Sequence, residues 1–83
     1  MFIFYFYITA VSLENMANFI EASGGTLVGS VAQVKIGRKN VFVQAISIQL
    51  AVSQRAQVVA SLINIRQKLN LTDKDVGIVN EKV

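Results

Sequence analysis

Residues 2–11 read FIFYFYITAV, and this stretch decides the fold of the 83-residue chain. Aromatic and β-branched residues dominate it, and such residues favour strands over helices. Side chains alternate between the two faces of a strand. One face of this segment is wholly apolar and includes Phe6 and Ile8, and the other face is mixed and carries Tyr5 and Tyr7. The period of two therefore predicts a buried central strand whose second face bears tyrosines.

The same segment fits neither a membrane-spanning helix nor an export signal. A spanning helix needs about 20 apolar residues, and Ser12 and Glu14 interrupt this run too early. A secretory signal carries Lys or Arg before its apolar stretch, whereas the first basic residue of this chain is Lys35. We therefore expect no membrane association and a cytoplasmic location.

Two amphipathic helices and three further strands are expected downstream. Ser12 is a typical N-cap residue, Glu14 suits the first turn of a helix, and Gly24-Gly25 ends that helix. Ser53 predicts the start of a second helix, whose apolar residues recur at helical spacing up to Leu69. The strand pattern returns over residues 26–36, 41–50 and 76–79, with a polar turn at 37–40 between the first two.

The order strand, helix, strand, strand, helix, strand describes two βα units around a central hairpin. Right-handed crossovers place the first and third strands at the centre of an antiparallel sheet. We therefore predict one domain, residues 1–83, with an α+β fold: a βαββαβ ferredoxin-like sandwich in which two helices cover one face of a four-stranded antiparallel sheet. The two most apolar strands, 2–11 and 41–50, then take the central positions.

Hydrophobicity assigns the inward faces of the second and third strands. The inward residues are expected to be Val28, Ala32, Val34 and Ile36 in one strand, and Phe42, Ile46, Ile48 and Leu50 in the other. Gln44 falls on the same inward face, and its sequence neighbours give no reason for a polar residue there.

The helices leave the opposite face of the sheet open. That face is expected to carry Ile3, Tyr5, Tyr7, Thr9, Leu27, Val31, Gln33, Val41, Val43, Ala45 and Ser47. A monomer rarely leaves so much contiguous apolar surface in water. We therefore predict that a second copy of the chain, or a protein partner, covers this face. The contact residues predicted for it are Ile3, Tyr5, Tyr7, Val31 and Val43.

The basic residues suggest a second surface. The formal net charge is +3, and residues 26–71 contain no carboxylate. The predicted topology places the 37–40 turn and the end of the second helix at one end of the sheet. The basic rim predicted there consists of Lys35, Arg38, Lys39, Arg66 and Lys68. Such a rim suits phosphates or an acidic protein surface, although cations are also common at hairpin tips and helix C-termini.

Composition excludes most catalytic chemistry. The chain has no His, Cys or Trp and only five carboxylates, so thiolate and imidazole sites are absent. We therefore expect no enzyme activity, no cofactor and no metal. The predicted function is a small regulatory module of the accessory or inhibitor type that forms a homodimer through its open sheet and binds a larger partner. The alternative is a nucleic-acid-binding protein in which Tyr5 and Tyr7 stack on unpaired bases beside the basic rim.

Overall fold

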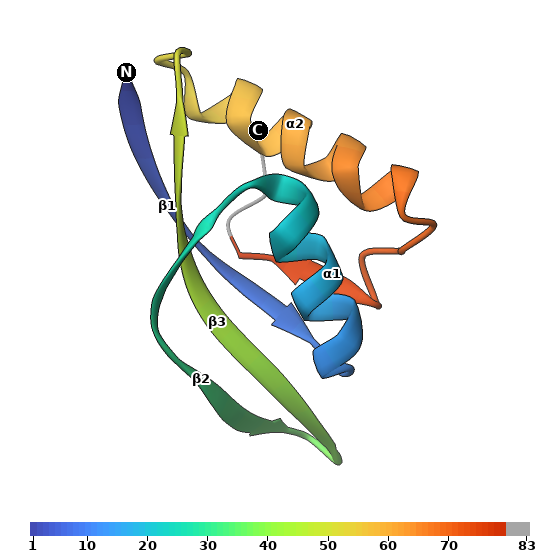
Figure 1. Cartoon of the computed structure of the whole chain (residues 1–83). Helices are drawn as coiled ribbons and strands as arrows, with labels where there is room; N and C mark the ends of the chain where they lie inside the picture. Colours follow the sequence, from blue (N-terminus) through green and yellow to red (C-terminus); the bar gives the residue numbers. More distant parts are fainter. Residues whose placement is uncertain (80–83) are drawn as a thin grey trace.

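Four strands and two helices make up the computed structural model, which describes residues 1–79 (Figure 1). The elements are β1 (Phe2–Ala10), α1 (Leu13–Ser23), β2 (Thr26–Ile36), β3 (Lys39–Leu50), α2 (Arg55–Lys68) and β4 (Val76–Ile78). The strands form one antiparallel sheet in the order β2-β3-β1-β4. The ferredoxin-like α+β fold is thus confirmed, with the two most apolar strands at the centre of the sheet.

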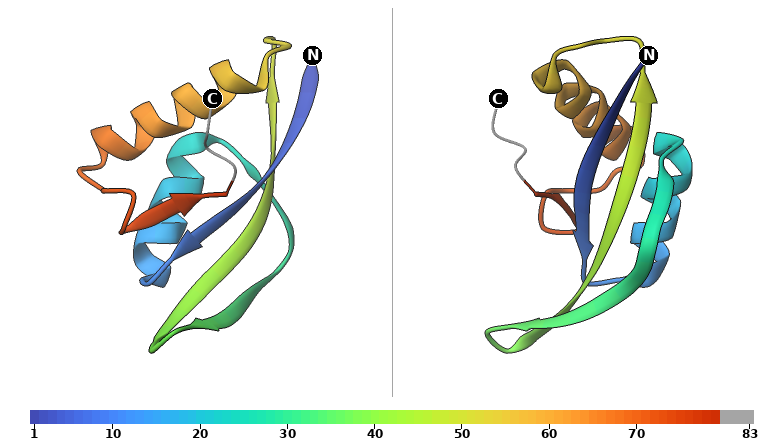
Figure 2. Two further views of the ribbon diagram at one scale, coloured as in Figure 1. Left: turned by 180° about the vertical axis from the view of Figure 1, so that it is seen from behind. Right: turned by 90° about the vertical axis from the view of Figure 1, so that its left-hand side faces the viewer.

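Both helices pack on the same face of the sheet. A single buried cluster joins side chains of β1, β3 and β4 to side chains of both helices. Its largest fully buried members are Phe6 and Ile8 from β1, Phe19 from α1, Ile46 from β3 and Leu62 from α2. The other face carries no helix, and the β2–β3 hairpin curves past the end of α1 (Figure 2).

The ends of α1 follow local chemistry. The Ser12 hydroxyl accepts a hydrogen bond from the backbone N–H of Asn15 at 3.3 Å, so the predicted N-cap is confirmed. Gly24 ends the helix with φ of 71°, a left-handed conformation that glycine adopts without strain.

The second helix begins one residue later than predicted. Its N-cap is Gln54 rather than Ser53, and the cap has no side-chain hydrogen bond. Arg55 holds this end instead, because its guanidinium lies 4.5 Å from the centre of the Phe6 ring and donates to the Tyr5 carbonyl at 3.3 Å. A contact with β1 thus fixes the position of this helix start.

The predicted facing of β2 is wrong. Residues opposite each other in an antiparallel pair point to the same face, and Leu27 pairs with the buried Ile46. Leu27 therefore lies on the helix side. The residues predicted to point inward lie on the open face: Val28, Ala32, Val34 and Ile36. The hydrophobicity of its residues does not show which face of β2 points toward the helices, because β2 is an edge strand whose residues are all exposed. Burial therefore does not separate its two faces.

A bulge in β2 explains the polar residue on the inward face of β3. The pairing shifts between Val28 and Ala32, where Gly29 has φ of 71°. Gln44 is 4% exposed, and its side-chain amide donates to the carbonyls of Val28 at 3.0 Å, Gly29 at 3.4 Å and Ala45 at 2.8 Å. Gln44 thus satisfies backbone carbonyls that the bulge removes from the strand ladder.

Candidate functional site

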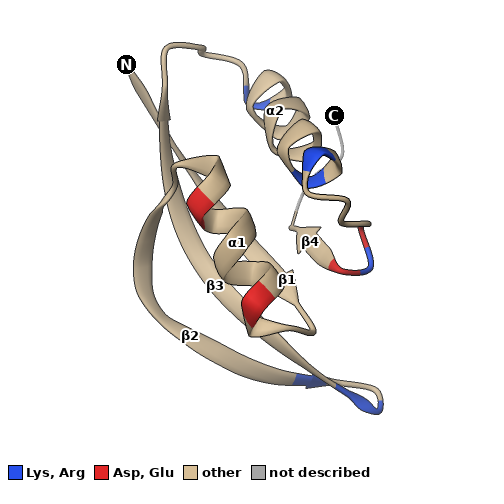
Figure 3. Ribbon diagram, turned by 45° about the vertical axis from the view of Figure 1, so that its right-hand side comes forward, with Lys and Arg blue, Asp and Glu red and all other residues tan. Residues whose placement is uncertain are grey.

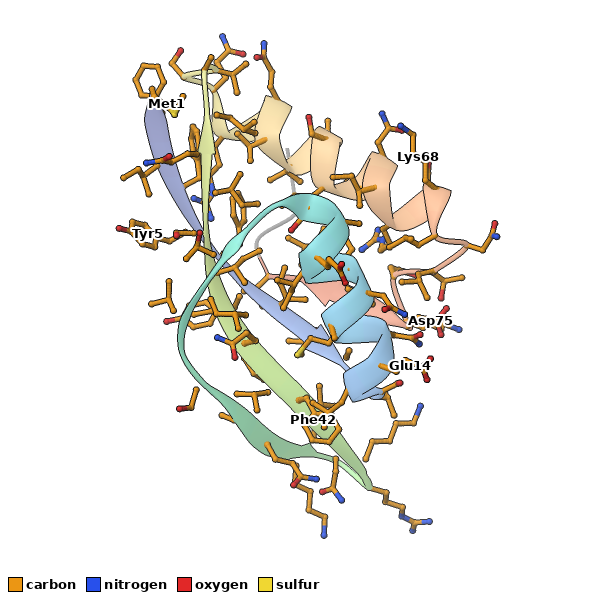
Figure 4. All side chains as sticks on the ribbon, viewed as in Figure 1. Met1, Tyr5, Glu14, Phe42, Lys68 and Asp75 are labelled. Atoms are coloured by element: carbon orange, nitrogen blue, oxygen red, sulfur yellow. The ribbon has the colours of Figure 1, made fainter. Side chains whose placement is uncertain are left out.

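The face of the sheet that carries no helix exposes several large apolar side chains. Ile3, Tyr5 and Tyr7 of the central strand β1 are 52%, 62% and 56% exposed. Their partners on β3 are Gln49, Ser47 and Ala45. Tyr5 points away from both helices (Figure 4). Val43 lies on the same face, opposite Thr9, and is half-buried. The structure therefore brings together four of the five residues predicted for this surface.

The correct facing of β2 makes the open face more apolar than predicted. Val28, Val34 and Ile36 are 42%, 44% and 61% exposed and stand beside the residues of β3. They lie on the face where the sequence predicted Leu27, Val31 and Gln33. Of the strand positions on this face within residues 1–79, Lys39 alone is charged. We call the part of this surface that lies along β1 the open face; it consists of Ile3, Tyr5, Tyr7 and Thr9 of β1, Val43, Ala45, Ser47 and Gln49 of β3, and Thr26, Val28 and Ala32 of β2.

A hollow of about 390 Å³ lies on the open face beside Tyr5. Its lining residues come from β1, β3 and the start of β2: Ile3, Tyr5, Gly24, Thr26, Ser47 and Gln49. Hydroxyl and amide groups line most of it, so the open face combines projecting aromatic rings with a concave polar spot. This is the combination of anchor and pocket found at the centre of many protein interfaces.

The predicted placement of Val31 on the open face is wrong. Val31 lies on the helix side of β2, where it and Leu27 line a groove of about 390 Å³ against α1. Leu13 and Ala17 form the α1 wall of this groove and are exposed. They are exposed because, among the strands, α1 packs chiefly on β1, β3 and β4, which leaves β2 uncovered. Sequence periodicity offered no signal for this groove.

The basic rim does not form as predicted, because Arg66 is buried. Only 7% of Arg66 is exposed, and its guanidinium donates to the Val76 carbonyl of β4 at 3.0 Å. Its role is to tie α2 to the edge strand. A periodic sequence pattern places Arg66 near the apolar stripe, but only the tertiary contact with Val76 shows why a cation lies there.

The remaining predicted rim residues lie in two separate places. Lys35, Arg38 and Lys39 are exposed at the β2–β3 hairpin, which carries no acidic residue (Figure 3). Lys68 lies at the C-terminal end of α2, far from this hairpin (Figure 4). The loop between α2 and β4 lies between these two groups. Asp73 of this loop and Lys39 of the hairpin line the same hollow. The structure thus has one basic cluster, at the hairpin, rather than the continuous rim that the sequence predicted.

The tyrosines have no aromatic partner on the neighbouring strand. Phe42, the aromatic residue of β3, pairs with Gln33 and lies on the helix side, as the sequence predicted. A base stacked on Tyr5 or Tyr7 would therefore meet Ser47 and Ala45 next to the ring. This arrangement favours apolar docking over base stacking, which uses several aromatic platforms on adjacent strands.

Comparisons with known proteins give no relative: no protein-family model, no curated protein and no solved structure matches this chain. Among the helices of residues 1–79, none has the length and apolar character needed to cross a membrane.

Proposed function

We propose that this protein is a non-enzymatic interaction module that self-associates through its open face and, as a dimer, regulates a larger macromolecule. The observation that carries the proposal is the exposure of Ile3, Tyr5 and Tyr7, each more than half exposed, on one face of one sheet. Exposed apolar patches of this kind mark interaction sites.

The size of the open face supports a second copy as its occupant. Strand β1 has 9 residues. At about 3.4 Å per residue and about 4.8 Å between strands, the face measures roughly 30 Å by 15 Å. Two such faces, with side chains standing above each, bury on the order of 1,000 Å², the lower bound for a specific interface. Sheets stacked in this way pack about 10 Å apart with their side chains interlocked.

The charge distribution also supports self-association. A two-fold axis brings the same surface of each copy together. A charged side chain at the centre of the interface would therefore face the same charge on the other copy. Lys39 lies at one end of β3, and an antiparallel arrangement of the two copies places the two Lys39 side chains at opposite ends of the interface. The centre then contains only tyrosine, aliphatic and small polar side chains.

Edge pairing is a weaker route to a dimer than stacking. The outer strand β2 is interrupted by the bulge between Val28 and Ala32, and bulges of this kind protect sheet edges from pairing with another chain. The surface of β1 and β3, which pair without interruption from Phe2 to Ala10, remains as the surface suited to a partner.

Light scattering over low to high micromolar concentrations tests the proposal. The wild-type chain is expected to reach twice its monomer mass of 9.1 kDa. Tyr7→Asp is expected to weaken self-association by about 100-fold or more, because it buries an unpaired carboxylate at the interface. Circular dichroism is the control that checks whether each variant remains folded.

Leu27→Asp is the matched control. Leu27 is 59% exposed, close to the 56% of Tyr7, but lies on the helix side of the sheet. This variant is expected to dimerise like the wild type. A wild-type chain that stays monomeric at high micromolar concentration would contradict the proposal, as would dissociation by Leu27→Asp without dissociation by Tyr7→Asp.

A further inference from the structure

The tip of the β2–β3 hairpin extends past the end of β1. The last pair between β1 and β3 is Ala10 with Phe42, whereas β2 and β3 continue to pair as far as Ile36 with Lys39. Residues 34–41 therefore form a two-stranded ribbon that we call the arm (Figure 3). Three residue pairs at about 3.4 Å per residue make the arm about 10 Å long.

Cations lie on both faces of the arm and at its tip. Lys35 is on the helix side, paired with Asn40, and Lys39 is on the open side, paired with Ile36. Arg38 lies in the two-residue turn, where the left-handed Gly37 precedes it. All three cations are exposed. Within residues 1–79, none of these three side chains has a hydrogen-bond or ion-pair partner.

Acidic residues weaken the charge of the arm only slightly. The strands β2 and β3 and the turn between them contain no Asp or Glu. Asp73 and Lys74 both line the hollow that borders Lys39, so their formal charges cancel, and Asp75 leaves this loop with a net charge of −1 against +3 for the arm. Asp75 is engaged within its own loop, where its carboxylate accepts hydrogen bonds from the backbone and the hydroxyl of Thr72.

We propose that the arm enters the major groove of duplex DNA. Lys35 and Lys39 then contact the phosphates of the two opposite strands, and Arg38 reaches toward the base edges. The major groove is about 12 Å wide and about 8.5 Å deep and admits a two-stranded β-ribbon, so an arm about 10 Å long reaches its floor.

The arrangement of the cations favours DNA over an acidic protein. A protein surface meets one face of the arm and leaves the cation on the other face unused, whereas a groove between two phosphate backbones engages both faces. This inference names the macromolecular partner, and it does not depend on self-association through the open face. Tyr7→Asp leaves the arm intact, so the two proposals fail independently.

Fluorescence polarisation with a labelled mixed-sequence B-DNA duplex, measured across a salt series, tests the inference. The two phosphate contacts, of Lys35 and Lys39, predict that log K falls with log[salt] with a slope of about −1.8 for each arm. Lys35→Ala and Lys39→Ala are each expected to reduce the magnitude of the slope by about 0.9, whereas Arg38→Ala is expected to weaken binding with little change in the slope. Lys68→Ala, an exposed cation on α2, is the control and is expected to leave the slope unchanged.

Two duplex substrates separate groove entry from general attraction to phosphates. Methylation of guanine N7, which lies in the major groove, is expected to weaken binding. An RNA duplex is expected to bind more weakly than DNA, since its major groove is too narrow and deep for side chains to enter. Absence of DNA binding at low salt, slopes for Lys35→Ala and Lys39→Ala equal to that of the wild type, or insensitivity to N7 methylation would overturn the inference. Binding of an acidic polypeptide without binding of DNA would also overturn it.

Discussion

At the scale of single residues, Gln44 is a buried polar group that joins β3 to the bulge of β2. It is buried on the apolar side of β3, next to Ile46, and its amide donates to three backbone carbonyls. Two of these carbonyls, of Val28 and Gly29, belong to the bulge that separates β2 from the regular ladder. A buried polar side chain is retained where the backbone around it needs a donor.

Gln44→Leu tests this role. Leucine fills a similar volume but donates no hydrogen bond, so the carbonyls of the bulge lose their donor. The expected loss in the free energy of unfolding is about 1–3 kcal/mol, the cost of unsatisfied buried polar groups, measured by urea denaturation. Gln49→Leu, at an exposed position of the same strand, is the control and is expected to change stability little. Equal stability of Gln44→Leu and the wild type would show that the bulge does not depend on this amide.

At the scale of elements, the loop between α2 and β4 is closed by one reciprocal pair. The Thr72 backbone N–H donates to the Asp75 carboxylate at 2.9 Å, the Thr72 hydroxyl donates to it at 3.1 Å, and the Asp75 N–H donates back to the Thr72 carbonyl at 3.0 Å. The two hydrogen bonds that the carboxylate accepts, first the one from the Thr72 backbone N–H and then the one from its hydroxyl, lower the pKa of Asp75 below its usual 3.8. They set the position at which the chain enters β4.

The lowered pKa of Asp75 predicts how stability depends on pH. The folded state favours the carboxylate, so Asp75 contributes stability above its unfolded pKa of 3.8. That contribution is lost as the pH falls through the lower folded value. The melting temperature of Asp75→Asn is therefore expected to lie below that of the wild type at neutral pH, and the difference is expected to shrink below about pH 4. Asp73→Asn, in the same loop, is the control. A difference that does not change with pH would contradict the role of the charge.

The sequence predicts elements better than it predicts their facing. The bounds of β2 and the caps of α1 follow from local chemistry, that is, from alternation, from the Ser12 hydroxyl and from Gly24. The facing of β2 follows from its pairing with β3, and apolar residues on both faces of an uncovered edge strand hide it. The hairpin contains the missing information, because Val41 pairs with Val34 and the two must share a face.

At the scale of the whole molecule, two surfaces are available to partners, and the sequence located both incompletely. Alternation along β1 and β3 places Ile3, Tyr5, Tyr7 and Val43 correctly. It does not reveal that Arg66 is buried against β4, since that burial depends on a tertiary contact between a helix and a strand, which alternation within one strand does not show. The open face and the arm lie along the same hairpin, so a dimer joined through its open faces presents two arms.

The most direct test of self-association through the open face is an isotope-filtered NOE experiment on a sample that mixes labelled and unlabelled chains. Such an experiment detects only protons of different copies that lie close together. The account predicts intermolecular NOEs from the rings of Tyr5 and Tyr7 and from the methyl groups of Val43. Intermolecular NOEs confined to Leu13, Leu27 and Val31 in the groove beside α1, or none at high protein concentration, would contradict it.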